Sequence, residues 1–385
     1  MNAPASDRAF DAVVVGAGVI GLSIAYELLC RDRSVVVIEK DRPGAGASGA
    51  AGGMLAAISE AEDQPDTLTE LCLEAARQYP GFVVGLERVA GRRTGYRDEG
   101  TLWVALNRDD QRELERLEAT LSGQDLPVEH LDAGQIIALE PHLSARVLGG
   151  LRVASDHQID PRALLRVLQR AVRALGGRFL CPARVLRVVE RNGRAAGVLA
   201  VDPDGREHVV AARHVVLAAG AWTDASILGP DSPFSLRPVK GQLVRLRGPV
   251  LIRHVARTPD VYVVPREDGE LLIGATVEEM GFDVSPRAGA VMDLLRHAWD
   301  LLPGSYDLDF VSVDVGLRPA TDDHLPLIGP GVLDGLLLAT GHYRHGILLA
   351  PVTARGIAAW IAGEPVDPRL LPFVPQARSA SETVA

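Results

Sequence analysis

The chain of 385 residues has few cysteines, no long apolar run and no recognisable export segment. Its three cysteines, Cys30, Cys72 and Cys181, lie far apart without metal-ligand spacing, which excludes a disulfide framework and fits a reducing compartment. No stretch of about 18 residues is apolar and uncharged throughout, so neither a membrane-spanning helix nor a membrane partner is expected. Residues 1–8 are polar and lead into an apolar strand, not into a signal-peptide core. These absences predict a cytoplasmic protein.

Positive charge is also in short supply. Lys and Arg number 40 against 50 Asp and Glu, and the net charge of −10 argues against a nucleic-acid partner. The ten histidines show no metal-ligand pattern, so no metal site is expected. The G-x-S-x-G, H-E-x-x-H and Walker motifs are absent, and no acid–base side chain can be named as catalytic. That pattern is typical of a reaction whose difficult step is carried by a cofactor.

A dinucleotide-binding motif is present near the start of the chain. An apolar run, a helical pattern and a second apolar run follow one another within residues 11–38. Gly16, Gly18 and Gly21 form G-x-G-x-x-G, which allows a tight turn, close approach of a pyrophosphate and close packing of helix on strand. Glu39 follows the second run and can accept hydrogen bonds from the hydroxyls of an adenosine ribose. Together they predict a Rossmann-type site.

FAD and NAD share this fingerprint, and two further segments favour FAD. Residues 47–54, Ala-Ser-Gly-Ala-Ala-Gly-Gly-Met, let the backbone pass close to a ligand, and Ser48 can hold a phosphate or sugar. The alternative is a flexible linker. Residues 341–347, Gly-His-Tyr-Arg-His-Gly-Ile, precede a long helix whose first N–H groups can stabilise the negative charge of a reduced flavin. The alternative is an ordinary strand-to-helix turn.

Three side chains are candidates for holding a substrate carboxylate: Tyr262, Arg318 and Arg344. An arginine offers a planar fork that binds a carboxylate through two hydrogen bonds, and tyrosine adds a neutral hydroxyl donor. Taken singly, an arginine is more often a surface or structural residue. Spacing along the chain does not join the three into one site.

The order of the patterns predicts an α/β protein with a Rossmann-type FAD-binding domain and a second, antiparallel-sheet α+β substrate domain. Residues 183–211 look like a β-meander, and residues 236–275 like antiparallel strands with turns at Lys240-Gly241 and Asp268-Gly269. The predicted FAD-binding domain comprises 9–89, 151–232 and 317–375, the substrate domain 90–150 and 233–316, and a disordered tail 376–385.

Together these motifs resemble the D-amino-acid oxidase superfamily of FAD enzymes, and within it the glycine oxidases of thiamine biosynthesis. The resembling features run from Val13 to about Ile361. The matching stretches are 14–21, 50–55, 238–242, 262–266, 274–276, Gly-Leu-Arg-Pro at 316–319 and Gly-His-Tyr-Arg-His-Gly-Ile-Leu-Leu-Ala-Pro at 341–351. The last two are the most specific.

The resemblance implies that Arg318 binds the substrate carboxylate, that Tyr262 lines the pocket and that the segment around Arg344 closes over flavin and substrate. It implies a cofactor site made of Gly16, Gly18, Val19, Ile20, Gly21, Glu39, Lys40, Ala47, Ser48, Gly52, Gly53, Met54, Val185, Gly220, His342, Tyr343, Arg344, His345, Gly346, Ile347 and Leu348. Val185 is expected beside the adenine.

Two positions depart from the family pattern. His345 stands where the family often has Asn, and Val277 where glycine oxidases often have Met, so the size of the substrate stays open. No cysteine lies near the C-terminal turn, where related sarcosine oxidases bond their flavin, and non-covalent FAD is therefore expected.

The activity that the resemblance implies is oxidative deamination of glycine, with sarcosine and small D-amino acids as further candidates. A hydride passes to flavin N5, the imine becomes a 2-oxo acid (glyoxylate from glycine) and ammonia, and dioxygen becomes hydrogen peroxide. The glycine imine would serve the thiazole ring of thiamine, and a homo-oligomer (dimer or tetramer) is expected. Three alternatives stay open: a D-amino-acid dehydrogenase that reduces a quinone, an NAD-linked dehydrogenase and a non-catalytic dinucleotide-binding partner protein.

Overall fold

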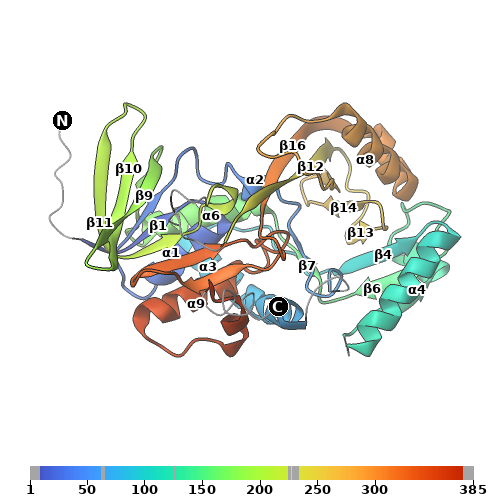
Figure 1. Ribbon diagram of the computed structural model, residues 1–385. Helices are drawn as coiled ribbons and strands as arrows, with labels where there is room; N and C mark the ends of the chain where they lie inside the picture. The colour runs from blue at the N-terminus through green and yellow to red at the C-terminus, as the bar shows by residue number, and fades with distance from the viewer. Residues whose placement is uncertain (1–8, 62–65, 125, 224–226, 228–233, 376–385) are drawn as a thin grey trace.

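A parallel sheet forms one half of the molecule in the computed structural model, which describes residues 9–61, 66–124, 126–223, 227 and 234–375 (Figure 1). The predicted tail 376–385 lies outside these residues. The strand order is β17-β18-β11-β1-β2-β8, and β9 and β10 extend it from β11. The strands are β1 (Phe10–Val15), β2 (Val35–Ile38), β8 (Arg178–Leu180), β9 (Arg184–Arg191), β10 (Arg194–Val201), β11 (Glu207–Leu217), β17 (Leu327–Pro330) and β18 (Leu336–Thr340).

The central strands β1, β2, β11 and β18 are parallel and apolar on both faces, the pattern typical of a buried parallel sheet. Val13 of β1 lies opposite Val36 of β2 and Val215 of β11, and all three are buried. Strands β9, β10 and β11 pair antiparallel, which confirms the predicted meander.

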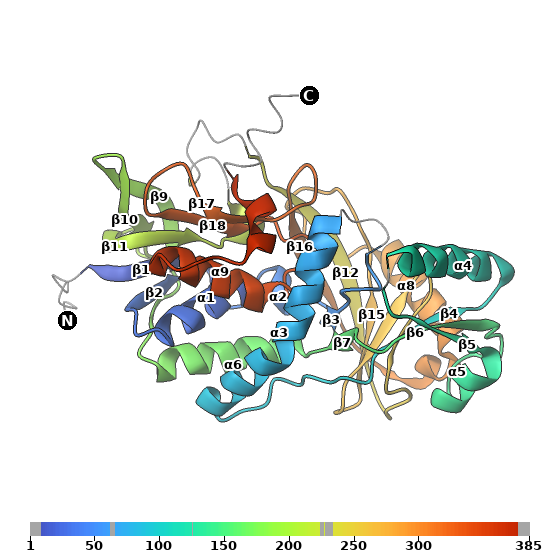
Figure 2. The same cartoon turned by 90° about the horizontal axis from the view of Figure 1, so that it is seen from below.

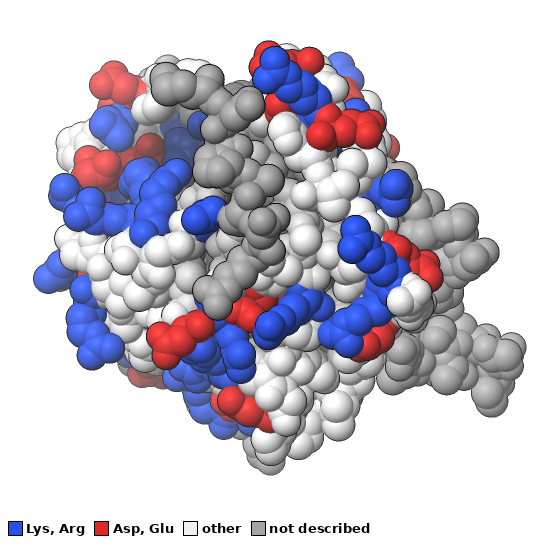
Figure 3. Space-filling view, turned by 90° about the vertical axis from the view of Figure 1, so that its left-hand side faces the viewer, with Lys and Arg blue, Asp and Glu red and all other residues white. Residues whose placement is uncertain are grey.

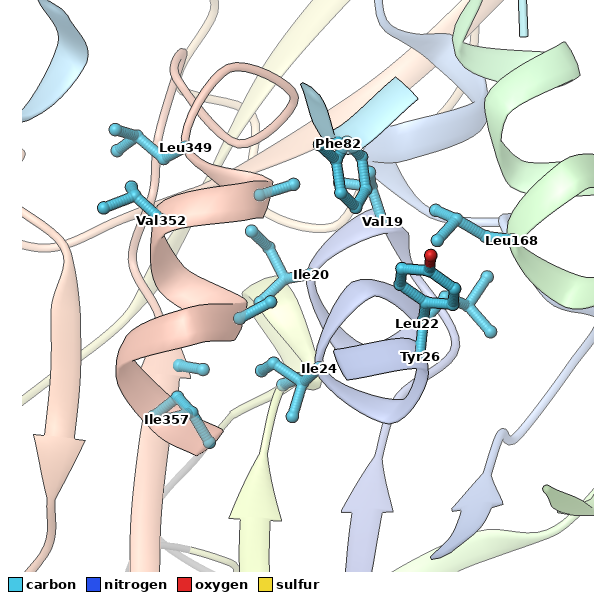
Figure 4. Close-up of a cluster of buried hydrophobic side chains, with 14 of the residues drawn as sticks. Val19, Ile20, Leu22, Ile24, Tyr26, Phe82, Leu168, Leu349, Val352 and Ile357 are labelled. Atoms are coloured by element: carbon cyan, nitrogen blue, oxygen red, sulfur yellow. The ribbon is translucent and has the colours of Figure 1, made fainter. Parts of the chain in front are cut away.

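Helices cover one face of this sheet (Figure 2). They are α1 (Val19–Leu29), α3 (Asp66–Ala90), α6 (Pro161–Ala174) and α9 (Ala350–Ala362). Asp160 caps α6 by accepting a hydrogen bond from the backbone N–H of Arg162 at 2.8 Å, as the sequence predicts. Figure 4 shows Ile20 and Ile24 of α1 facing α9, in a buried cluster that also includes Val352 and Ile357. This core fixes α1, and with it the glycine turn at its start.

A second sheet forms the other half, in the order β16-β12-β15-β14-β13-β4-β6-β5. Its neighbours are antiparallel except for β13 and β4. The strands are β4 (Thr101–Ala105), β5 (Glu129–Asp132), β6 (Gly149–Val153), β12 (Arg237–Arg247), β13 (Val255–Arg257), β14 (Tyr262–Pro265), β15 (Glu270–Gly274) and β16 (Asp309–Ala320).

Short elements complete the fold. The helices α4 (Arg108–Gly123), α5 (Ala133–Leu139) and α8 (Ala288–Leu301) pack on the second sheet. The remaining elements are α2 (Ala47–Ala50), β3 (Met54–Leu55), β7 (His157–Gln158), η1 (Gly220–Trp222), η2 (Pro303–Asp307) and η3 (Pro368–Phe373). Every helix in the described part of the chain is too short or too polar to cross a lipid bilayer.

The predicted turn at Lys240-Gly241 is wrong, because both residues lie inside β12. Gly241 pairs with Gly316 of β16, and the strand continues without a break to Arg247. Glycine is required here for a different reason, which becomes visible at the functional site.

Candidate functional site

A cavity of about 580 Å³ lies between the two sheets. Its wall takes residues from α1, β2 and α2 on one side and from β14 and β16 on the other; α2 and β16 meet in the middle of the molecule (Figure 1). Every substrate- and cofactor-binding residue predicted from the sequence lines this cavity except Gly21, and Val277 lines it too. The structure therefore brings the predicted residues together, while the role of each stays a prediction.

The glycine turn at the start of α1 packs closely against the neighbouring backbone. A Cβ at Gly16 would lie 2.4 Å from the carbonyl oxygen of Ala218, and one at Gly21 would lie 2.0 Å from that of Gly16. Gly21 is therefore a packing residue, which explains why it does not line the cavity. The hydroxyl of Ser48 accepts a hydrogen bond from the N–H of Val19 at 3.0 Å. Its own hydrogen and the neighbouring amides of α1 can face a phosphate.

The acid at the end of β2 is held by two backbone groups. The carboxylate of Glu39 accepts hydrogen bonds from the N–H of Ala17 at 2.8 Å and of Asp41 at 3.0 Å. A carboxylate has about four lone-pair sites, so two remain for ribose hydroxyls. The Nζ of Lys40 lies 3.5 Å from the ring centroid of Trp222, which also lines the cavity and was not predicted.

A buried arginine, to which the sequence analysis gave no role, holds the backbone of the cavity-lining residue Gly52. Arg266 donates from Nη2 to the carbonyl oxygen of Gly52 at 2.5 Å and from Nη1 to Oε1 of Gln158 at 3.0 Å. Burial lowers the pKa of Arg266 to about 10. Arg266 ends the Tyr-Val-Val-Pro-Arg stretch that resembles the family, so the sequence could have singled it out. The stretch does not reveal that its hydrogen-bond partners are Gly52 and Gln158.

The C-terminal turn is anchored from several sides. The N–H of Tyr343 donates to the carbonyl oxygen of Pro319 at 3.0 Å, and its ring stacks on His324 at 4.4 Å. His342 lies 3.0 Å from the hydroxyl of Thr353, and burial lowers the pKa of His342 to about 3, so this imidazole is neutral at physiological pH. The turn is therefore held against both β16 and α9.

Arg318 presents a buried guanidinium to the cavity. Its Nη1 donates to the carbonyl oxygens of Lys240 at 3.3 Å and Thr276 at 3.1 Å, and burial lowers the pKa of Arg318. In the part of the chain that the structure describes, no Asp or Glu forms an ion pair with it. A buried cation without an anion is costly, so this guanidinium is suited to an anionic ligand.

Tyr262 reaches the same end of the cavity. A Cβ at Gly52 would lie 3.2 Å from its hydroxyl, and one at Gly274 would lie 2.5 Å from it. Burial raises the pKa of Tyr262 to about 12, which keeps the hydroxyl neutral and able to donate.

Glu60 lines the cavity and was not predicted from the sequence. Its carboxylate lines the cavity, 3.9 Å from Nδ1 of His345 and 3.9 Å from Nη1 of Arg257. The guanidinium of Arg257 in turn lies 3.8 Å over the ring of Trp103. In the sequence Glu60 belongs to a short acidic stretch that looks like a surface loop, and no motif separates it from its neighbours. Among the described residues no group of His, Cys, Asp and Glu is arranged to hold a metal ion.

A family model described as FAD dependent oxidoreductase matches residues 11–360. The chain belongs to this family. The resemblance to the D-amino-acid oxidase superfamily is thereby confirmed, and FAD is the cofactor of this oxidoreductase. The residues present fit that cofactor: Gly16 and Gly18 line the cavity without a side chain, and the α1 amides and Ser48 offer hydrogen-bond donors.

Individual relatives agree with this assignment. This chain is 35% identical over 368 residues to the bifunctional protein ThiO/ThiG of Trichormus variabilis. The match covers 94% of this chain and 54% of that protein, so this chain spans about half the length of the relative. It is 35% identical over 370 residues to glycine oxidase of Geobacillus kaustophilus, covering 94% and 96%. The crystal structure of glycine oxidase from G. kaustophilus matches with a TM-score of 0.86 at 33% identity, over 95% of this chain and 98% of that one. The predicted α/β fold class is confirmed.

Proposed function

We propose that this enzyme oxidises the amine of glycine, with sarcosine and small D-amino acids as further substrates. The observation that carries the proposal is the buried guanidinium of Arg318, which has no carboxylate partner among the described residues and faces the cavity beside the neutral hydroxyl of Tyr262. An amino acid brings the anion that this site lacks. The names of the relatives support glycine as that amino acid.

The chain's own residues orient the substrate. Arg318 binds the carboxylate through two charged hydrogen bonds, contributing roughly 1.5–3 kcal/mol each. Tyr262 adds a third donor. Arg344, which the structure leaves exposed, and the turn that carries it cover the site from the other side and limit access of water.

When bound, FAD would supply the acceptor for the hydride that leaves the substrate α-carbon. The substrate then departs as an imine, which hydrolyses to a 2-oxo acid and ammonia. Dioxygen is the final acceptor and becomes hydrogen peroxide. In thiamine biosynthesis the glycine imine would be consumed directly for the thiazole ring. None of the three cysteines lines the cavity, which supports non-covalent FAD.

The proposed division into two domains follows the two sheets closely. We propose that 9–89, 151–232 and 317–375 form the FAD-binding domain and 90–150 and 233–316 the substrate domain. The parallel sheet draws its strands from the first set, while β6 and β16 of the second sheet run a few residues past these boundaries.

Two expectations concern partners and place. A homo-oligomer (dimer or tetramer) is supported by exposed aromatic side chains near α8: Trp299 is 52% exposed, Tyr306 77% and Phe310 59%. Basic and acidic side chains are interspersed on the face shown in Figure 3, which supports the absence of a nucleic-acid partner. We propose a cytoplasmic location. Light scattering on the purified enzyme tests the oligomer.

The decisive experiment mixes the yellow holoenzyme anaerobically with glycine. The proposal expects the colour to bleach and to return when air is admitted. A protein that only binds the dinucleotide stays yellow, and a quinone-linked dehydrogenase bleaches but recovers its colour only with a quinone analogue. Peroxide release with glycine, sarcosine, D-alanine and D-proline then ranks the substrates, and Val277 and His345, which line the cavity, are the residues to exchange if the ranking is unexpected.

A further inference from the structure

The substrate end of the cavity contains both charges that an amino acid needs. A zwitterionic amino acid carries a carboxylate, for which Arg318 is suited, and an ammonium group, which requires an anion. Glu60 supplies a carboxylate at this end. Its charge acts on the pKa of Tyr262, of Arg318 and of Arg344, so it lies within electrostatic reach of each group that would surround the substrate.

Glu60 lies near the imidazole of His345, which can take up a proton. Nδ1 of His345 lies 3.9 Å from Oε2 of Glu60, and both residues line the cavity. Burial lowers the pKa of His345 below its usual 6.5, although the Glu60 carboxylate acts in the opposite direction. The imidazole is therefore neutral at physiological pH and has a lone pair available. Distances between catalytic groups are often long before the substrate binds.

We propose that Glu60 binds the ammonium group of the amino-acid substrate and that the Glu60–His345 pair removes its proton. The N–H bond of the ammonium breaks, its electron pair stays on nitrogen as the lone pair of the neutral amine, and the proton passes through the carboxylate to Nδ1 of His345. The imidazolium that forms is stabilised by Glu60. This inference rests on the proposed function, because only an amine with a lone pair on nitrogen can release a hydride from the neighbouring carbon and become an imine.

Several charged or titratable groups interact with the pair and influence its behaviour with pH. They are Arg257 on β13, Tyr262 on β14, Arg318 on β16, Arg344 in the C-terminal turn, Asp156 before β7 and Cys72 on α3. Arg257, whose Nη1 lies 3.9 Å from Oε1 of Glu60, holds the carboxylate from the side away from His345. Arg344 disfavours the imidazolium and Glu60 favours it.

The test compares Glu60→Gln with Glu118→Gln in the FAD-loaded enzyme. Glu118 forms a similar pair with His130, at 3.1 Å, outside the cavity, and is therefore a matched control. With Glu60→Gln we expect kcat/KM for glycine near neutral pH to fall about a hundredfold, the size expected for a lost proton acceptor. Glycolate, which has the carboxylate but no ammonium, should bind both variants with the wild-type affinity, read from the shift of the visible flavin spectrum.

The pH profile separates a proton acceptor from a structural residue. In the wild type kcat/KM should fall as the pH drops through the lowered pKa of His345, below 6.5, because the imidazolium cannot accept a proton. In Glu60→Gln, kcat/KM should instead keep rising with pH until the ammonium group of free glycine loses its proton in solution. A Glu60→Gln enzyme with the wild-type profile and rate overturns the inference.

Two further outcomes are also informative. If Glu60→Gln does not retain FAD, His345→Asn decides: the inference expects a slower enzyme that binds glycolate normally and has lost the acid limb, and an unchanged limb overturns it. If wild-type enzyme binds glycolate but no amino acid bleaches it, the proposed function fails. The inference is then tested by binding alone: if the ammonium contact exists, Glu60→Gln should lower the affinity for glycine relative to glycolate tenfold or more.

Discussion

The guanidinium of Arg318 lies against the backbone of Gly241 on the neighbouring strand. A Cβ at position 241 would stand 2.5 Å from both terminal nitrogens of Arg318 and 2.6 Å from its central carbon. The two residues belong to β12 and β16, which pair antiparallel over almost their whole length. The missing side chain at 241 therefore makes room for the guanidinium of Arg318 beside the strand.

Gly241→Ala should raise KM for glycine tenfold or more while FAD stays bound, because the methyl group displaces Arg318 and off-rotamer side chains cost roughly 1 kcal/mol or more. Steady-state kinetics and the flavin-to-protein absorbance ratio measure both effects. Gly289→Ala is the control, since a Cβ there meets nothing within 4 Å. Equal KM values for the two variants would contradict the packing argument.

Arg318→Ala should raise KM by roughly a hundredfold or more, the loss expected when two charged hydrogen bonds to a carboxylate disappear. FAD content should stay normal, because Arg318 bonds only to carbonyl oxygens of the second sheet and its loop. Arg296→Ala, at a 60% exposed ion pair on α8, should behave as wild type. A near-normal KM in a purified Arg318→Ala enzyme would remove this residue from the substrate site.

Tyr262→Phe should raise KM about tenfold, the size of one hydrogen bond to a charged group. Because the pKa of Tyr262 is raised to about 12, the hydroxyl stays protonated, and the wild-type activity should show no loss from its ionisation up to about pH 11. Tyr306→Phe, at a side chain in η2 that is 77% exposed and does not line the cavity, serves as the comparison. Loss of FAD in Tyr262→Phe would indicate a structural role instead.

Ser48→Ala should weaken FAD binding about tenfold. The hydroxyl accepts a hydrogen bond from the N–H of Val19 at the start of α1. Losing a hydrogen bond of this kind at a helix N-terminus costs about 1 kcal/mol of stability, before any contact with the cofactor is counted. Quenching of flavin fluorescence during reconstitution of the apoprotein gives the Kd. Ser122→Ala, on the exposed end of α4, should leave the Kd unchanged.

Asp156 should make folding stability depend on pH. Its buried carboxylate accepts hydrogen bonds from the N–H groups of Ile58 at 3.0 Å and Ser59 at 2.7 Å, and burial raises the pKa of Asp156 from 3.8 to about 6. The folded chain therefore holds a proton that the unfolded chain releases between these values. Its contribution favours the folded state at low pH and is lost as the pH rises through about 6.

Asp156→Asn cannot titrate, so its stability relative to wild type should improve by up to about 3 kcal/mol as the pH rises from 4 to 8. Thermal unfolding of both chains across this range gives the difference. A constant gap between the two curves would show that Asp156 titrates normally.

The sequence alone determined the cofactor half of this protein. The contacts of Gly21 with Gly16 and of Glu39 with Ala17 lie within one strand–helix–strand unit, where spacing along the chain sets distance in space. The family, and with it Arg318 and Tyr262 as candidates, could be predicted from short stretches whose order is preserved.

Only the tertiary structure decided which residues come together around the cavity. Arg266 and Glu60 are far in sequence from their partners Gly52 and His345, and a buried polar side chain looks like a surface one until its neighbours are known. Gly241 was taken for a turn because a glycine has the same appearance in sequence whether it bends the chain or makes room for another residue. The physical reason is the same in each case: these positions are defined by contacts between segments that are far apart in the chain, and no local pattern encodes which segments will lie side by side.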